Sequence, residues 1–484
     1  MFDKNERNLS LLIDFYELTM SNNFILDNKQ NKIACFDVFF RSIPDNGGYC
    51  IMAGLEQVID FIKNLNFSED DINFLRSKNI FNEKFLEYLK NFKFSCDIFA
   101  IEEGYPIFPK EPILTVRGPI LECLLIETML LLTLNHQILI ATKASRICIA
   151  ANHRNVLEFG SRRAQGYDGA IYGARASIIG GCIGTSCTLA EKMFNVPSFG
   201  TMSHSWIQMF DNEYEAFKTW AEYSPNNCIL LIDTYNVLKS GLPNAIKIFK
   251  EISSKSKNFG VRIDSGDITY LTKKVRKVLN DEGFKNAKII VSNSLDEHII
   301  TNVLSEGAEV DIFGVGERLI TSKSEPILGG VYKLCALYDE DNNLIPKIKI
   351  SENNNKITIS GFKTVYRIFD SSNDMAIADL ITDFDEIIDE TKPLTLFDPT
   401  FTWKKKVVKN FYTIKLHKKI FDKGKCIYKS PNVMEIQSIK NRELSKLWPE
   451  IIRLENPQTY FVDLSEKLWK SNQELLNKHS NDYI

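Results

Sequence analysis

The sequence lacks any excess of positive charge. Among its 484 residues, 59 lysines and arginines stand against 62 aspartates and glutamates, and the formal net charge is −3. The sequence pI is about 6.2. A protein that holds nucleic acid through its phosphate backbone needs a broad basic surface. The charge balance therefore excludes general nucleic-acid binding, and we expect no nucleic-acid partner.

Long uncharged hydrophobic runs are also missing. The most apolar stretch, residues 119–142, is interrupted by polar side chains that are costly inside a bilayer. They are Glu122, Glu127, Asn135, His136 and Gln137. The opening MFDKNERNLSLLIDF is charged at its start and has no apolar core followed by a small-residue cleavage site. We expect a long buried helix at 119–142, no membrane association and no secretory signal.

Cysteine pairs with the spacing of a metal or redox site are absent. The ten cysteines are scattered without a CxxC pair, and Cys182 and Cys187 lie in a glycine-rich segment that does not suit structural zinc. Internal repeats are missing apart from the units described below. These features indicate reduced thiols and predict a cytoplasmic protein.

The length and composition favour several folded domains. A chain of 484 residues exceeds one ordinary core, and 44% hydrophobic with 25% charged residues is an average globular balance. We expect an α+β N-terminal domain at 1–150, an α/β domain at 151–335, and a β-rich, then helical, segment at 336–484; the family resemblance described below implies that this last segment packs on the first domain.

From about residue 156 to 316, short apolar runs repeatedly end in glycine or polar residues. The runs are VLEF before Gly160, PSFG before Thr201, CILLI before Asp233, FGVRI before Asp264, AKIIV before Ser292 and VDIF before Gly314. Such runs are typical of parallel strands covered on both faces. Helical spacing follows, for example from Ile268 to Val278 ahead of Gly283. A (β/α) barrel is favoured over an open doubly wound sheet, because nearly every strand end carries a candidate reactive group.

His204 is the most distinctive of these groups. It is one of only six histidines and stands in Gly200-Thr201-Met202-Ser203-His204-Ser205 after an expected strand. A partly exposed histidine there can serve as a nucleophile or proton carrier near neutral pH. A histidine hydrogen-bonded within its loop is an equally good interpretation of these residues alone.

A second group follows another expected strand, at Arg262, Asp264 and Asp267. The carboxylates suit Mg²⁺ or sugar hydroxyls, since both prefer oxygen partners. Asp267 can instead cap the next helix. Arg262 can bind a carboxylate through two parallel hydrogen bonds, or can belong to a structural ion pair.

A third group suits phosphate. Small residues after the last two strands leave backbone N–H groups accessible to a phosphate. They are Ser292, Asn293, Gly314 and Gly316. Arg162 and Arg163 stand beside another strand end, where they can bind a pyrophosphate or pair with Glu158. Tyr16, near the start of the chain, suits stacking on an aromatic ligand or a place in the core.

The order of these motifs closely resembles the nicotinate phosphoribosyltransferase family over nearly the whole chain. The matching stretches are DFYELTM (14–20), FFRSIPDNGGY (39–49), LEFGSRRAQGYDGA (157–170), FGTMSHSW (199–206), VRIDSGD (261–267), IIVSNSLDE (289–297), VDIFGVG (310–316) and LGGVYKL (328–334). The final ENPQTYFVDLSEKL is also similar to that family.

The resemblance implies a fold, a reaction and a set of residues. The fold is an irregular (β/α) barrel of the type II phosphoribosyltransferase kind, with an N-terminal α+β domain joined by C-terminal segments. The reaction converts nicotinate and 5-phosphoribosyl 1-diphosphate (PRPP) to nicotinate mononucleotide and diphosphate for NAD synthesis. It requires Mg²⁺ and is coupled to ATP hydrolysis through a phosphohistidine, here His204. The resemblance implies that Tyr16, Thr201 and Arg262 contact nicotinate. It also implies a homodimer in which Arg41 reaches the active site of the partner subunit.

One departure and several rivals accompany this resemblance. Many family members place threonine after the last Gly-x-Gly, where this chain has Glu317, and a carboxylate there would repel a phosphate unless turned away or bridged by Mg²⁺. The rivals are a nicotinamide or quinolinate phosphoribosyltransferase of the same fold, a sugar-phosphate isomerase or aldolase, and a non-catalytic relative. His204, Asp264 and Arg262 together argue against the last.

Overall fold

The computed structural model describes residues 7–252, 259–353 and 356–481, and the chain forms two compact units. Unit 1 comprises Met1–Ile138, Ile327–Pro431 and Ser438–Ile484, and unit 2 comprises Leu139–Pro326 with Asn432–Gln437. The breaks expected at 150 and 335 therefore differ from the observed ones at 138 and 326. The first break falls inside one continuous helix, α6 (Glu127–Ala150), so no change of composition marks it.

Unit 1 is built on a seven-stranded sheet in the order β13-β12-β1-β5-β3-β19-β20. β1 (Ile33–Phe39) pairs antiparallel with β5 (Leu114–Pro119) and with β12 (Val331–Tyr338). β3 (Asp97–Ile101) pairs with β5 and with β19 (His417–Asp422). Strands from the C-terminal third thus complete the N-terminal sheet, which confirms the expectation that C-terminal segments join the N-terminal domain.

A four-stranded sheet in unit 1 has the order β18-β14-β15-β21. Its strands are β18 (Phe411–Lys415), β14 (Lys363–Asp370), β15 (Ala376–Asp383) and β21 (Val462–Leu464). The buried pair Lys363–Asp37, with N and O 2.8 Å apart, connects β14 to β1. The other unit 1 strands are β2 (Cys50–Ile51), β4 (Pro106–Ile107), β13 (Leu344–Pro346), β16 (Leu394–Phe397), β17 (Lys405–Val408) and β20 (Lys425–Cys426).

Helices of unit 1 come from both ends of the chain. The N-terminal ones are α1 (Phe15–Leu26), α2 (Leu55–Asn64), α3 (Glu69–Ser77), α4 (Glu83–Lys90) and α5 (Ile120–Leu125), with the 3-10 turn η1 (Pro44–Asn46). The C-terminal ones are α15 (Val433–Leu444), which begins in unit 2, α16 (Pro449–Ile452) and α17 (Glu466–Asn481). In α3, Ser68 and Asp71 form a reciprocal capping box, which satisfies N–H groups at the start of the helix.

Unit 2 contains a six-stranded parallel sheet in the order β7-β6-β11-β10-β9-β8. The strands are β6 (Asn155–Glu158), β7 (Gly184–Thr185), β8 (Cys228–Leu231), β9 (Phe259–Ile263), β10 (Lys288–Ser292) and β11 (Ile312–Val315). β8 to β11 lie in chain order and β11 returns to β6, as in a barrel. Within the described ranges no ladder joins β7 to β8. The expected irregular barrel is confirmed as a half-barrel that is open at this point.

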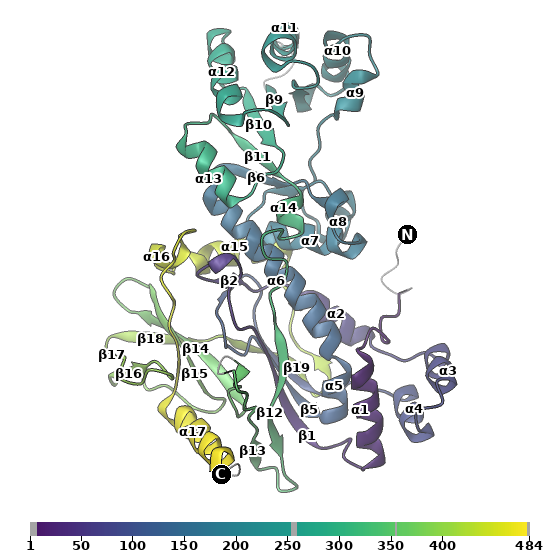
Figure 1. The fold of residues 1–484 in the computed structure, drawn as a ribbon, viewed down its shortest axis with the longest axis vertical. Coiled ribbons are helices and arrows are strands. Elements are labelled where there is room, and N and C mark those ends of the chain that lie inside the picture. The colour runs from purple at the N-terminus through teal and green to yellow at the C-terminus, as the bar shows by residue number, and fades with distance from the viewer. Residues whose placement is uncertain (1–6, 253–258, 354–355, 482–484) are drawn as a thin grey trace. The chain divides into compact units, whose positions relative to one another are not determined.

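Helices alternate with these strands along the chain (Figure 1). They are η2 (Ser161–Arg163), α7 (Tyr167–Gly180), α8 (Thr188–Phe194), α9 (His204–Gln208), α10 (Glu213–Tyr223), η3 (Pro225–Asn227), η4 (Val237–Gly241), α11 (Leu242–Ile252), α12 (Ile268–Asp281), α13 (Glu297–Ser305) and α14 (Glu317–Ile320). The helix expected after Asp267 is α12, and Gly283 follows it with a φ of +89°, a conformation that favours glycine.

The strand expected at PSFG is wrong. Residues 197–200 contribute only an isolated bridge between Ser198 and Thr185, and the paired strand is the two-residue β7. Pro197 has no N–H to donate to a ladder, so the segment pairs through the Pro197 carbonyl and the Phe199 N–H alone.

The apolar stretch at 119–142 forms α5 and the first part of α6, with Ile126 between them. In the part of the chain that the structure describes, no helix has the length and apolar character needed to cross a membrane. None of the ten cysteines, all of which lie in the described ranges, forms a disulfide bond.

Candidate active site

The carboxyl ends of the parallel strands in unit 2 gather most of the predicted site residues. Arg262 lies on β9, and its guanidinium meets three neighbouring segments. Its Nε donates to Ser292 Oγ at 3.0 Å, its Nη1 to Thr201 Oγ1 at 3.2 Å and its Nη2 to Asp264 Oδ1 at 3.1 Å. Its side chain is only 14% exposed. Each Nη atom retains a second N–H, so the fixed guanidinium can still bind a planar carboxylate.

His204 is the first residue of α9, and its ring Nε2 lies 3.1 Å from Oδ1 of Asp233. The Asp233 side chain is 1% exposed, whereas that of His204 is 41% exposed. The other Asp233 oxygen accepts hydrogen bonds from the Asp264 N–H at 2.9 Å and the Ser265 hydroxyl at 2.6 Å. A carboxylate at Nε2 favours a proton on that nitrogen and leaves Nδ1 as the nucleophilic atom.

The two aspartates of DSGD have different surroundings. Asp264 accepts from Arg262 and from the Ser292 hydroxyl. Asp267 accepts the Tyr270 N–H at 2.8 Å and thereby caps α12. No cluster of three or more His, Cys, Asp or Glu suited to a metal ion occurs among the described residues. The carboxylates of Asp264 and Asp267 are oxygen ligands of the kind that Mg²⁺ takes, and this ion commonly keeps several water or phosphate oxygens as further ligands.

The loops after β10 and β11 form the predicted phosphate region. Asn293 and Ser294 have φ values of 91° and 50°, so the chain turns sharply as β10 ends. A Cβ on Gly314 would lie 2.5 Å from the Phe159 ring, so packing alone requires glycine there. A Cβ on Gly316 would meet nothing closer than 3.4 Å. The Phe159 ring also lies beneath the Arg262 guanidinium, 5.7 Å from its central carbon.

Arg162 and Arg163 lie in η2, directly after β6, and are exposed. Glu158, which the sequence offered as their partner, is instead buried and accepts from the Thr185 hydroxyl at 2.6 Å and from the Gly160 N–H. Burial raises the pKa of Glu158. In the described segments no ion pair joins Glu158 to either arginine.

Glu317, the departure noted in the sequence, begins α14. Its carboxylate lies 2.7 Å from the Lys323 ammonium, and this pair lowers the pKa of Glu317. The carboxylate thus has a cationic partner in the turn that follows α14.

Two predicted residues belong to unit 1. Tyr16 lies on α1 with 48% of its surface exposed, and partial burial together with the charge of Glu127 raises the pKa of its hydroxyl. Arg41 follows β1 with its guanidinium over the Phe39 ring at 5.8 Å, and its buried Nε has no hydrogen-bond partner among the described residues.

Sequence reasoning gave no role to Asp233, Ser265 or Phe159, although it identified Asp233 as a strand end. Its position at a strand end could have indicated a role in the site, because the carboxyl ends of parallel strands meet at one edge of the sheet.

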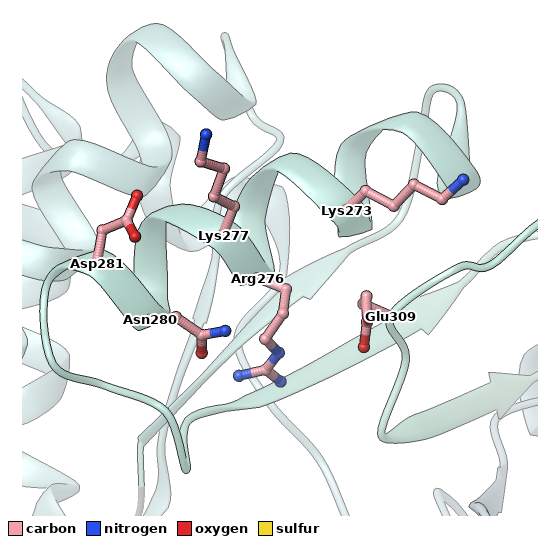
Figure 2. A pocket seen from close by; sticks show the side chains of 6 residues that line it. All are labelled: Lys273, Arg276, Lys277, Asn280, Asp281 and Glu309. Atoms are coloured by element: carbon pink, nitrogen blue, oxygen red, sulfur yellow. The ribbon is translucent and has the colours of Figure 1, made fainter.

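A separate hollow of about 270 Å³ lies against α12 and is lined by Lys273, Arg276, Lys277, Asn280, Asp281 and Glu309 (Figure 2). Asn280 and Asp281 end α12 and Glu309 precedes β11, so the hollow faces the amino ends of the strands. It is therefore remote from the cluster around Arg262.

Comparison with known proteins agrees with this arrangement. The chain matches models of the nicotinate phosphoribosyltransferase N-terminal domain (residues 11–135), family (155–343) and C-terminal domain (362–472). It is 43% identical to nicotinate phosphoribosyltransferase of Bacillus subtilis, covering 97% of this chain and 96% of the relative. It is 33% identical to that of Dictyostelium discoideum, covering 95% and 87%.

Solved structures give the same result. The crystal structure of human nicotinic acid phosphoribosyltransferase is similar with a TM-score of 0.83 and 27% identity, covering 96% of this chain and all of that one. Nicotinate-nucleotide pyrophosphorylase from Pyrococcus furiosus is similar with a TM-score of 0.70 and 25% identity, covering 92% and 97%. Since all three family models and relatives of full length match, the chain belongs to the nicotinate phosphoribosyltransferase family.

Proposed function

We propose that this enzyme transfers the phosphoribosyl group of PRPP to nicotinate, giving nicotinate mononucleotide and diphosphate for NAD synthesis, with ATP hydrolysis coupled through His204. The observation that carries the proposal is one cluster at the strand ends. It contains an arginine fixed for a carboxylate, a histidine fixed by a buried aspartate, and glycine and serine loops for phosphate.

Arg262 determines which acceptor substrate the enzyme uses. Its three hydrogen bonds hold the guanidinium plane, and the nicotinate carboxylate takes the remaining N–H groups, with Thr201 beside it. Nicotinamide presents a neutral amide that leaves this charge without its partner, so it is a poor substrate. Quinolinate carries a second carboxylate, which requires a further cation in the ring pocket.

The leaving group is diphosphate. Positive charge develops at the ribose anomeric carbon as the C–O bond breaks, so catalysis consists mainly of alignment and neutralisation of the leaving oxygens. Arg162 and Arg163 stabilise the diphosphate, Asp264 and Asp267 bind ribose hydroxyls or the metal, and the loops at Ser292, Asn293, Gly314 and Gly316 hold the 5′-phosphate. Bound Mg²⁺ supplies further neutralisation of the diphosphate charge.

ATP coupling is assigned to His204. Asp233 holds the proton on Nε2, so Nδ1 attacks the terminal phosphorus of ATP. The bond from this phosphorus to the bridging oxygen breaks and ADP leaves, and the phosphorylated ring gains roughly 1.5 to 2 negative charges. This charge appears beside Asp233, Asp264 and Arg262, which are connected by hydrogen bonds. Phosphorylation thereby alters the balance of charge around the acceptor and donor sites.

The remaining assignments are supported by the resemblance. Tyr16 stacks on the pyridine ring, Arg41 serves the partner's site in a homodimer, and the enzyme acts in the cytoplasm. The exposed face of Tyr16 is compatible with stacking.

The test measures nicotinate mononucleotide formed from nicotinate, PRPP and Mg²⁺, with and without ATP, for the native enzyme and His204→Ala. Product that rises with ATP in the native enzyme, and loses this response in the variant, supports the proposal. Turnover of nicotinamide or quinolinate in place of nicotinate would overturn the acceptor assignment. Inactivity with all three acceptors would favour the non-catalytic alternative.

A further inference from the structure

A charged side chain stands where the proposed phosphate loop ends. Glu317 follows Gly316 directly, and its carboxylate lies 2.7 Å from the Lys323 ammonium, with the two side chains 35% and 60% exposed. Lys323 lowers the pKa of Glu317, with smaller contributions from Arg163 and Arg318. Glu317 is therefore ionised at neutral pH, and it directly follows Gly316, one of the glycines that we assign to a phosphate.

The other two cations near Glu317 have different partners. Arg318 forms an ion pair with Asp296, and Asp296 also caps α13 through the Ile299 N–H. Arg163 is one of the two arginines assigned to diphosphate. Lys323 follows α14 in a turn in which its N–H bonds to the Arg318 carbonyl at 3.2 Å. Of these three cations, the Lys323 ammonium is therefore the one that pairs with the Glu317 carboxylate.

We propose that Lys323 is a positioning residue, which holds and neutralises Glu317 so that the loop Gly314-Val315-Gly316 accepts the phosphate of PRPP. The inference rests on the proposed function, because it needs that phosphate at this loop. Without Lys323, the carboxylate repels the phosphate and competes with the diphosphate for Arg163. Lys323 therefore acts on substrate through Glu317 and makes no contact with the substrate itself.

The pair is exposed, so its contribution to folding is small and binding can be measured separately. The experiment is a double-mutant cycle of the native enzyme, Glu317→Thr, Lys323→Ala and the double variant, with binding of PRPP and Mg²⁺ measured by calorimetry. We expect Lys323→Ala to weaken PRPP binding roughly three- to ten-fold in the native background, and less than about two-fold when residue 317 is threonine. The loss in the native background should shrink as salt is raised.

Lys250→Ala is a matched control. Lys250 and Glu282 form a pair of similar length, 2.6 Å, with similar exposure, 57% and 39%, on the outer helices of the same unit. Its removal should leave PRPP binding unchanged. Because Lys250 is remote from the phosphate loop, this control separates the effect at Glu317 from a general loss of positive charge.

Equal weakening by Lys323→Ala in both backgrounds would overturn the inference, because Lys323 would then act independently of Glu317. No weakening in either background would overturn it as well. An enzyme that binds PRPP but does not use nicotinate would refute the acceptor assignment, while the binding cycle would still decide the role of Lys323. A native enzyme that does not bind PRPP would refute both proposals.

Discussion

At the scale of single residues, Arg262 shows how two strand ends and a loop together define one recognition element. Its partners Thr201, Asp264 and Ser292 come from three separate segments, so the guanidinium cannot rotate without losing several hydrogen bonds. The Phe159 ring lies against one face of it. A rigid planar donor of this kind suits a planar carboxylate better than a flexible ammonium does.

We expect Arg262→Lys to raise the KM for nicotinate by on the order of 10²-fold, since lysine cannot reproduce two parallel hydrogen bonds to a carboxylate. The KM for PRPP should change much less. Steady-state kinetics with each substrate varied in turn will measure both constants. An equal rise in the two KM values would show that Arg262 supports the whole site and does not recognise nicotinate in particular.

Asp233 illustrates what the sequence did not reveal about the site. The run CILLI predicted that a strand would end at Asp233, but its partner His204 lies 29 residues earlier. The contact is set by the folded path of α9 and α10, which local spacing does not encode. By contrast, the cap formed by Asp267 involves residues only three apart, and the sequence predicted it as one of two roles.

Replacement of Asp233 by asparagine should reduce ATP-stimulated turnover by about 10²-fold or more, because the ring of His204 loses the charge that fixes its tautomer. Turnover without ATP should fall less. Phosphate transfer from labelled ATP to the protein will measure the step directly. Ser265→Ala is the control, since it removes one hydrogen bond to Asp233 and keeps the pair with His204. Full phosphorylation of the asparagine variant would contradict the role given to Asp233.

At the scale of elements, the sequence predicted long and regular segments better than short ones. α12 has apolar residues at helical spacing and a glycine after its end, and it forms as expected. The segment at 197–200 is apolar but contributes one bridge, because a proline removes a donor and only two strand residues, Gly184 and Thr185, face it. Register and pairing of such short strands depend on neighbours that are distant in sequence.

Helix α1 contains a carboxyl group, that of Glu17, whose pKa is much higher in the folded protein than in the unfolded chain. Glu17 is fully buried, and its desolvation raises the pKa of its carboxyl from 4.5 to about 8. The folded protein holds a proton on Glu17 between these values while the unfolded chain does not, so stability falls as pH rises through this range.

We therefore expect Glu17→Gln to gain stability relative to the native protein as pH rises from 4.5 to 8, by roughly 3–5 kcal/mol in total. Glutamine retains the oxygen that accepts from Thr128 at 3.0 Å, so the packing is preserved. Denaturant unfolding at several pH values will give the difference between the two proteins. A difference that stays constant over this range would contradict the assignment of a raised pKa to Glu17.

At the scale of the whole molecule, unit 1 depends on contacts between the two ends of the chain. β1 and β3 find partners in β12 and β19, about 300 residues later in the chain. The resemblance to the family implied that the C-terminal segments pack on the N-terminal domain, but local spacing could not give these pairings. Other contacts within unit 1 also join side chains that are far apart in the chain and meet only after folding, such as Lys363 and Asp37.

Substitution of Arg367 would test directly whether unit 1 depends on contacts between distant parts of the chain. Its guanidinium binds both Asp379 oxygens, at 2.8 and 2.6 Å, and the Pro106 carbonyl at 2.9 Å, and it is buried. Tyr460 also donates to Asp379, at 2.9 Å, so segments from three parts of the chain meet here. Arg367→Ala leaves Asp379 buried beside Glu111, whose pKa burial already raises. We expect the variant to lose about 3–5 kcal/mol of stability.

The matched comparison is Arg76→Ala, which removes an arginine that also binds both oxygens of one carboxylate, that of Glu83. This pair is 47% and 69% exposed, so water replaces the lost partner, and the melting temperature should hardly change. Hydrogen exchange followed by mass spectrometry will localise the effect of each substitution. Peptides from β14, β15 and residues 105–111 should exchange faster in Arg367→Ala, whereas peptides from the parallel sheet of unit 2 should not. Equal effects of the two variants would mean that exposure does not govern the strength of these pairs, and that the ends of the chain are held together by other contacts.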